Sequence, residues 1–275
     1  SGTVDLNAGQ RSLSAANDVV VSGVVSNGGL TKAGSGVLTL SGANTYASGT
    51  LVSAGVLQVG NNGTSGAITG NITNNAALAY YRTDAHTVSA VLSGTGALTN
   101  LAGTLTLTGA STLSGNTTVS GGILIQNGTN VSSAVTVASG AFLYGTGSNG
   151  TTTVNGQLSA GSATNTVGNL KAAALNLENN GRMAVDITAM TGTAGVNWDV
   201  ITLGSGGGTY TVNAADGSDF VISLKGSPSI DPSQAYTLKI IDGGTANSFV
   251  ANKFTILTND FTANTEGGTF SVDAT

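Results

Sequence analysis

Residues 36–43 read GVLTLSGA and residues 103–110 read GTLTLTGA, so the same pattern returns 67 positions further along the chain. Leu and Thr alternate within it, which is typical of a β-strand, because successive side chains of a strand point to opposite faces. Gly stands on both sides, and Gly marks turns. An internal repeat built from short strands predicts a repetitive β architecture.

The correspondence extends in both directions from this stretch. Residues 52–57 (VSAGVL) match residues 119–124 (VSGGIL), and Gly29-Leu30-Thr31 is similar to Ala97-Leu98-Thr99. We place the two copies near residues 24–60 and 91–127. Further short alternating segments, such as residues 135–137, follow at intervals of roughly ten residues with Gly, Asn and Ser between them.

The composition favours a right-handed parallel β-helix over a β-sandwich for residues 1–180. Gly accounts for 42 of the 275 residues, Pro for 2, aromatic residues for 5% and charged residues for 8%. Small aliphatic side chains can stack in the narrow core of a β-helix, and Gly and Asn accept the positive φ of its corners. A sandwich usually carries more aromatic residues and more Pro in its loops.

The region after residue 180 has a different composition. It contains the one Trp, both Met and both Pro of the sequence, together with nine of the thirteen acidic residues. We predict a β-rich C-terminal cap or small β-domain over residues 181–275, since a stack of coils otherwise ends in an unpaired edge. Strand-like runs within it are Met183–Ile187, Asp199–Leu203, Phe220–Leu224, Tyr236–Ile241 and Thr269–Val272.

Several classes of function are excluded by charge and residue content. The formal net charge is -5, and the eight basic residues form no cluster of the kind that nucleic acid requires. There is no Cys for a disulfide or a thiolate metal site. No apolar run approaches the roughly 20 residues of a membrane span.

The repeat also carries a family resemblance. Residues 29–46 (GLTKAGSGVLTLSGANTY) and 49–60 (GTLVSAGVLQVG) resemble the autotransporter-associated β-strand repeat, also called the passenger-associated transport repeat, of bacterial surface proteins. The second copy departs from the pattern, because Ser111-Thr112-Leu113 replaces Asn44-Thr45-Tyr46. The resemblance implies a secreted β-helical stalk or passenger, located outside the cell or on the bacterial surface.

Few residues suggest catalysis. Arg82, Asp84 and His86 lie close together, but one Asp and one His are weak grounds for acid–base chemistry, and a solvated loop with an ion pair explains them better. We interpret Asp186 and Asp199 as turn or edge residues. The sequence predicts no enzyme, no cofactor and no metal site.

The leading hypothesis is an extracellular structural subunit that assembles with copies of itself into a fibre, sheath or layer. Both ends of the sequence lie within a strand pattern, so we expect terminal strands to join neighbours; the expected assembly residues are Val4, Leu6, Val19, Val21, Val24, Phe270 and Val272. The alternative is an adhesin or passenger stalk that binds host or matrix glycans, with possible contacts at Tyr80, Tyr81 and Trp198. A polysaccharide-active β-helix enzyme is the third reading.

Overall fold

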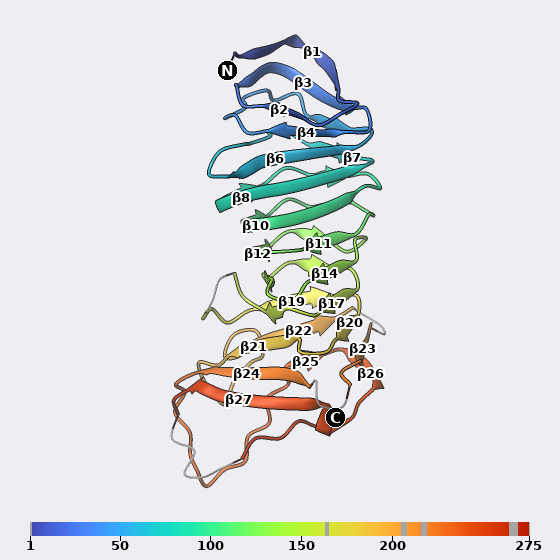
Figure 1. Cartoon of the computed structure of the whole chain (residues 1–275). Helices are drawn as coiled ribbons and strands as arrows, with labels where there is room; N and C mark the ends of the chain where they lie inside the picture. Colours follow the sequence, from blue (N-terminus) through green and yellow to red (C-terminus); the bar gives the residue numbers. More distant parts are fainter. Residues whose placement is uncertain (1, 163–164, 205–207, 216–218, 264–268, 275) are drawn as a thin grey trace. The chain divides into compact units, whose positions relative to one another are not determined.

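The structure is a computed structural model that describes residues 2–162, 165–204, 208–215, 219–263 and 269–274. Its regular structure is almost entirely β-strand, and the strands of its sheets pair in parallel. Figure 1 shows the successive strands of the chain. The chain divides into two compact units. Unit 1 comprises Ser1–Leu124 and Gly128–Ala134, and unit 2 comprises Ile125–Asn127 and Val135–Thr275.

Unit 1 winds through two parallel sheets. The first contains β1 (Val4–Ser14), β3 (Val25–Ala33), β5 (Thr50–Val52), β7 (Ile72–Asn74) and β9 (Leu92–Ser93). The second contains β2 (Val19–Val21), β4 (Val37–Leu40), β6 (Val56–Gly63), β8 (Ala77–Val88), β10 (Ala97–Leu107), β11 (Thr117–Val119) and the start of β12 (Ile123–Gln126). The short β13 (Thr129–Asn130) follows. Each strand pairs with the strand about one coil away in the sequence, which confirms the predicted parallel β-helix.

The core of unit 1 is a stack of aliphatic side chains. Leu38, Leu57, Leu78 and Leu98 stand in register on β4, β6, β8 and β10, and none is more than 2% exposed. Their neighbours in sequence point to the other face, as the period-two pattern requires. Repeating one residue type at one register position buries apolar surface continuously from coil to coil.

Buried polar side chains hold the turns of unit 1 from inside. Lys32 is 0% exposed, and its Nζ donates to the carbonyl oxygens of Ala33, Gly34 and Ala54 at 2.8, 2.7 and 2.9 Å. Asn100 occupies the equivalent position of the second repeat, and its Nδ2 donates to the carbonyls of Gly121 and Ile123. The sequence pattern gave no sign of this shared donor role.

Equivalent residues of the two repeat copies pair in the same way, but in different sheets of the coil. Leu30 is in register with Thr50 in the first sheet, and its counterpart Leu98 is in register with Thr117 in the second. The second copy therefore begins about one face further round the coil. The repeat length is not a whole number of coils.

Unit 2 contains three ladders of parallel strands. One contains β14 (Val135–Val137), β17 (Thr152–Val154), β20 (Leu175–Leu177), β23 (Gly208–Val212) and β26 (Gly244–Ser248). Another contains β15 (Phe142–Tyr144), β18 (Gln157–Ser159), β21 (Arg182–Asp186), β24 (Phe220–Gly226) and β27 (Phe254–Phe261). The third contains β16 (Ser148–Asn149), β19 (Asn169–Ala172), β22 (Val200–Leu203) and β25 (Ile241–Asp242). A single helical turn, η1 (Ala251–Lys253), precedes β27.

The ladders of unit 2 continue beyond residue 180. Leu158, Met183, Ile222 and Ile256 follow one another in register on β18, β21, β24 and β27. The segment interpreted as a cap thus adds parallel coils as far as Phe261. The domain boundary at residue 180 stays a prediction.

Two of the predicted strand-like runs are not strands. Within Tyr236–Ile241, Ile241 alone belongs to a strand, and residues 269–272 have no regular structure. Their apolar side chains instead line a cavity of unit 2, described below. The alternation of apolar and polar residues predicted strands here. The prediction failed because an irregular segment that lies over an apolar space can show the same alternation.

Candidate functional sites

A charged cluster lies on β8 in unit 1. The guanidinium of Arg82 donates to both carboxylate oxygens of Asp84, at 2.9 and 2.8 Å. It also donates to the carbonyls of Thr64 and Gly66, so it fixes the turn between β6 and β7. The hydrogen bond from Arg82 holds the pKa of Asp84 below its usual value. This carboxylate is therefore held as the partner of a structural arginine.

His86 lies on the same strand with its ring against Tyr80, at a centroid distance of 5.7 Å. Burial, followed by the nearby charge of Arg82, lowers the pKa of His86. Its Nε2 and the Tyr80 hydroxyl are buried, and neither bonds to any part of the chain that the structure describes. Because Asp84 engages Arg82 and makes no hydrogen bond to His86, no Asp–His pair is assembled.

Two acidic residues of unit 2, which the sequence analysis interpreted as turn or edge residues, are buried. Asp186 and Asp199 are 6% and 3% exposed, so they are interior residues. Asp199 Oδ1 accepts a hydrogen bond from the Gly168 amide at 2.8 Å, and its Oδ2 accepts from the Asp186 amide and the Ser159 hydroxyl. These donors satisfy the carboxyl group and let it be buried. Burial nevertheless raises the pKa of Asp199 to about 7 and also raises that of Asp186.

No metal cluster accompanies these acids. Over the ranges that the structure describes, no three His, Cys, Asp or Glu side chains gather in a way that could hold an ion.

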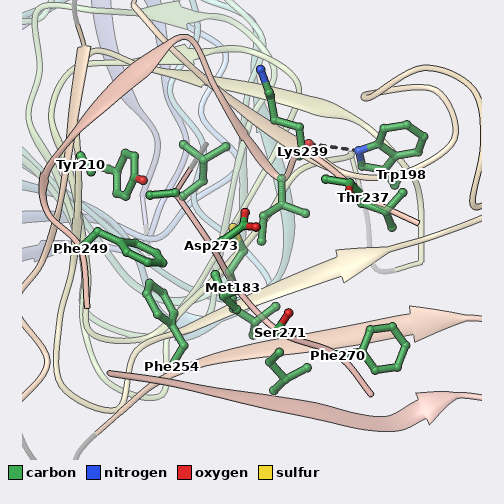
Figure 2. A pocket seen from close by; sticks show the side chains of 18 of the residues that line it. Met183, Trp198, Tyr210, Thr237, Lys239, Phe249, Phe254, Phe270, Ser271 and Asp273 are labelled. Atoms are coloured by element: carbon green, nitrogen blue, oxygen red, sulfur yellow. Dashed lines mark hydrogen bonds between the residues drawn. The ribbon is translucent and has the colours of Figure 1, made fainter. Parts of the chain in front are cut away.

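Unit 2 contains a cavity of about 710 Å³. Its floor is formed by Met183, Ile222 and Ile256, which stack in register on β21, β24 and β27. Figure 2 shows the surrounding side chains, which come from β23, the segments before β25 and β27, and the C-terminal residues. The aromatic members are Trp198, Tyr210, Tyr236, Phe249, Phe254 and Phe270.

Three residues that the sequence singled out meet at this cavity. Trp198 is 7% exposed, and its indole N–H donates to the Lys239 carbonyl at 3.1 Å. Phe270 and Val272 line the same space, and the Phe270 ring packs edge-to-face on Phe261. The sequence had assigned Trp198 to glycan contact and the other two to assembly. Their convergence was not predicted, although the concentration of aromatic residues after residue 180 was a signal for it.

The remaining predicted residues lie in unit 1. Leu6 is 2% exposed, Val19 is 43% exposed, and Val4, Val21 and Val24 are half-buried on or near the first strands. Within the described residues β1 pairs with β3 and β2 with β4, so the outer edge of each carries no strand partner. These residues therefore lie on or beside the first strand of each sheet among the described residues.

The two tyrosines proposed for glycan contact differ in exposure. Tyr80 is 1% exposed and faces the interior, so its ring offers no face on which a sugar could stack. Tyr81 is half-buried on the opposite side of β8. The burial of Tyr80 does not fit the proposed contact. Tyr81 differs in exposure because period-two alternation puts adjacent residues of a strand on opposite faces.

The fold defines a parallel β-helical repeat protein. The passenger-associated-transport-repeat family matches residues 30–59 and 102–125, which lie within the two repeats found in the sequence. The chain therefore carries passenger-associated transport repeats, as the resemblance predicted.

One curated relative extends this result. Over 54 residues the chain is 48% identical to the "Adhesin BmaC autotransporter" of Brucella suis biovar 1 (strain 1330). The match covers 20% of this chain and 2% of that protein. No solved structure matches the chain.

Within the described ranges, no helix has the length and apolar character needed to cross a membrane.

Proposed function

We propose that this chain is a segment of the secreted passenger of an autotransporter-type surface protein, with an adhesive or stalk role outside the cell. The main support is that both matched repeats fall on strands of the coil. Residues 30–59 include β4, β5 and the first half of β6, and residues 102–125 include β11 and most of β12. The relative named as an autotransporter adhesin supports the same reading.

The chemistry of the chain agrees with a role as a scaffold. Asp84 is engaged by Arg82, and Asp199 is enclosed by the donors of the interior, so neither is placed to act on a bound polymer. We expect no polysaccharide cleavage by the chain. A depolymerase screen that found activity lost in Asp84→Ala would favour the enzyme reading instead.

Surface display tests the proposal. The chain is placed between a secretion signal and an outer-membrane translocator barrel in a Gram-negative host, and an epitope tag at its N-terminus is detected on intact cells. We expect tag exposure, together with binding of the cells to a panel of matrix proteins and glycans above that of cells carrying the barrel alone. A chain that stays inside the cell would contradict the passenger proposal, and display without binding would favour a stalk.

A glycan contact would have to use the accessible side of β8. Tyr81 is the proposed residue in unit 1, since it is half-buried while Tyr80 is enclosed. Selective binding on a glycan array, lost in Tyr81→Ala and kept in Tyr80→Phe, is the expected result for an adhesive surface there.

The second candidate is a self-assembling structural subunit. The observation that favours it is the exposure of the apolar side chains of Val19 and Val20 on β2. Lys on an edge strand discourages pairing with another chain. Filaments or higher oligomers in electron microscopy and sedimentation, lost in Val20→Lys, would support this candidate; a monomer at every concentration would contradict it.

A further inference from the structure

We propose that the cavity of unit 2 binds a small soluble organic cation of the quaternary-ammonium class. No part of the passenger proposal is needed for this inference. It depends on the volume of the cavity, its aromatic walls and the one unpaired charge among its lining residues.

The volume suits a small ligand. A space of about 710 Å³ is within the range of small-molecule sites. It opens to solvent, because Thr237, Lys239 and Asp273 in its lining are exposed. Its floor of Met183, Ile222 and Ile256 is apolar and offers water no partner.

The walls favour a positive charge. Tyr210, Phe249 and Phe254 reach the cavity from β23, from the segment after β26 and from β27. The rings of Phe249 and Phe254 both line the space, with their centroids 5.8 Å apart and their planes inclined at 32°. Aromatic faces carry partial negative charge and attract organic cations, above all those that are poorly hydrated.

The charge of the lining has the matching sign. Asp273 lines the cavity, and in the view of Figure 2 it lies between the Tyr210 side and the Trp198 side. No ion pair or hydrogen bond joins its carboxylate to any residue that the structure describes. Lys239 is the other charged lining residue, but its ammonium pairs with Asp242 at 3.3 Å, and Figure 2 shows it directed away from Asp273.

These features select a ligand that is both apolar and cationic. A trimethylammonium group presents methyl groups to the aromatic rings and to the floor of the cavity. Its charge is spread over those methyl groups, so little hydration is lost on entry. A primary ammonium would lose stronger hydrogen bonds to water, and an anion would be repelled by Asp273.

The test uses the single tryptophan as reporter, since Trp198 lines the cavity. Fluorescence of the full chain is titrated with phenyltrimethylammonium and with its neutral isostere tert-butylbenzene, and then with choline and 3,3-dimethylbutanol. We expect saturable binding of each cation, about tenfold tighter than its neutral isostere. Equal binding of charged and neutral partners would overturn the proposal and leave an unselective apolar cavity. If none of the four compounds binds, the proposal is also overturned.

Variants separate the two contributions. Asp273→Asn lies outside the strands, so the fold should be kept; we expect it to weaken cation binding several-fold and leave the neutral isostere unchanged. Phe249→Leu should weaken the binding of both cations, because it removes one aromatic ring from the lining. Asp260→Asn removes an exposed acid that does not line the cavity and should behave like the parent chain. Loss of cation binding in Asp260→Asn to the same degree as in Asp273→Asn would contradict a local site.

A lipid headgroup contains the same trimethylammonium chemistry. Vesicles of phosphatidylcholine and of phosphatidylglycerol therefore form a separate arm of the experiment. Binding to phosphatidylcholine vesicles without binding of the free cations would overturn the assignment to a soluble ligand. Binding of the free cations without vesicle binding would support it.

Discussion

The most direct test of the interior of unit 1 is Lys32→Met. The ammonium of Lys32 supplies hydrogen bonds to three carbonyl oxygens, those of Ala33, Gly34 and Ala54. The Ala33 oxygen also accepts from the Ala15 amide and keeps a partner in the variant. Methionine fills nearly the same volume, so the main effect is the loss of donors at Gly34 and Ala54 rather than a cavity.

The expected cost follows from those two oxygens. Each buried carbonyl left without a donor costs about 1–3 kcal/mol, and removal of a buried charge offsets part of the total. We expect Lys32→Met to lower the free energy of opening of unit 1 by about 3 kcal/mol. Lys32→Asn should lose less, because Asn100 shows that an amide can donate to the same turn in the second repeat.

Native-state hydrogen exchange of the amides in β3, β4 and β6 measures this quantity without assuming that the whole chain unfolds at once. The control is Lys171→Met, which removes an exposed lysine of β19 in unit 2. We expect the control to change stability by less than about 0.5 kcal/mol. A change no larger than this in Lys32→Met would refute the reasoning that the ammonium holds the turn.

Three further outcomes are expected. Because the pKa of Asp199 is raised, the folded chain keeps a proton which the unfolded chain has lost, so stability should fall as pH rises from about 4 to about 7. Asp199→Asn should flatten this dependence of stability on pH, as measured by urea unfolding followed by circular dichroism. Gly55→Ala should cost about 2 kcal/mol or more, because φ is +66° and a Cβ would clash with the Gly34 oxygen. Gly63→Ala places its Cβ with nothing within 4 Å, and the melting temperatures of the two variants make the comparison. Arg82→Met should speed hydrogen exchange at residues 64–66, since the guanidinium no longer binds the carbonyls there, and unchanged exchange would contradict that role.

The course of the coil could be predicted from the sequence because its cause is local. Alternating Leu and Thr between glycines specify short strands, and the repetition of Leu38 and Leu57 at one register position specifies a stack. The passenger-repeat resemblance pointed to the same fold. The strands β21, β22 and β24 were anticipated closely for the same reason.

The sites could not be predicted because they depend on contacts between coils. Lys32 looks like a surface lysine in the sequence, and its burial follows from carbonyls that lie one coil away at Ala54. Asp199 looked like a turn residue, but it is enclosed by donors from residues 159, 168 and 186. The cavity combines side chains of residues 183–274, which no local pattern relates.

The displacement of the second repeat onto another face has a consequence for what unit 1 presents to its surroundings. Leu30 and Leu98 occupy the same place in the repeat but belong to different sheets, so the side chains next to them emerge in different directions around the coil axis. In an array of such copies, equivalent surface groups would point in different directions around the coil axis. Any contact that recognises the repeat itself would then be available from several sides, and would not require the protein to approach its target in one orientation.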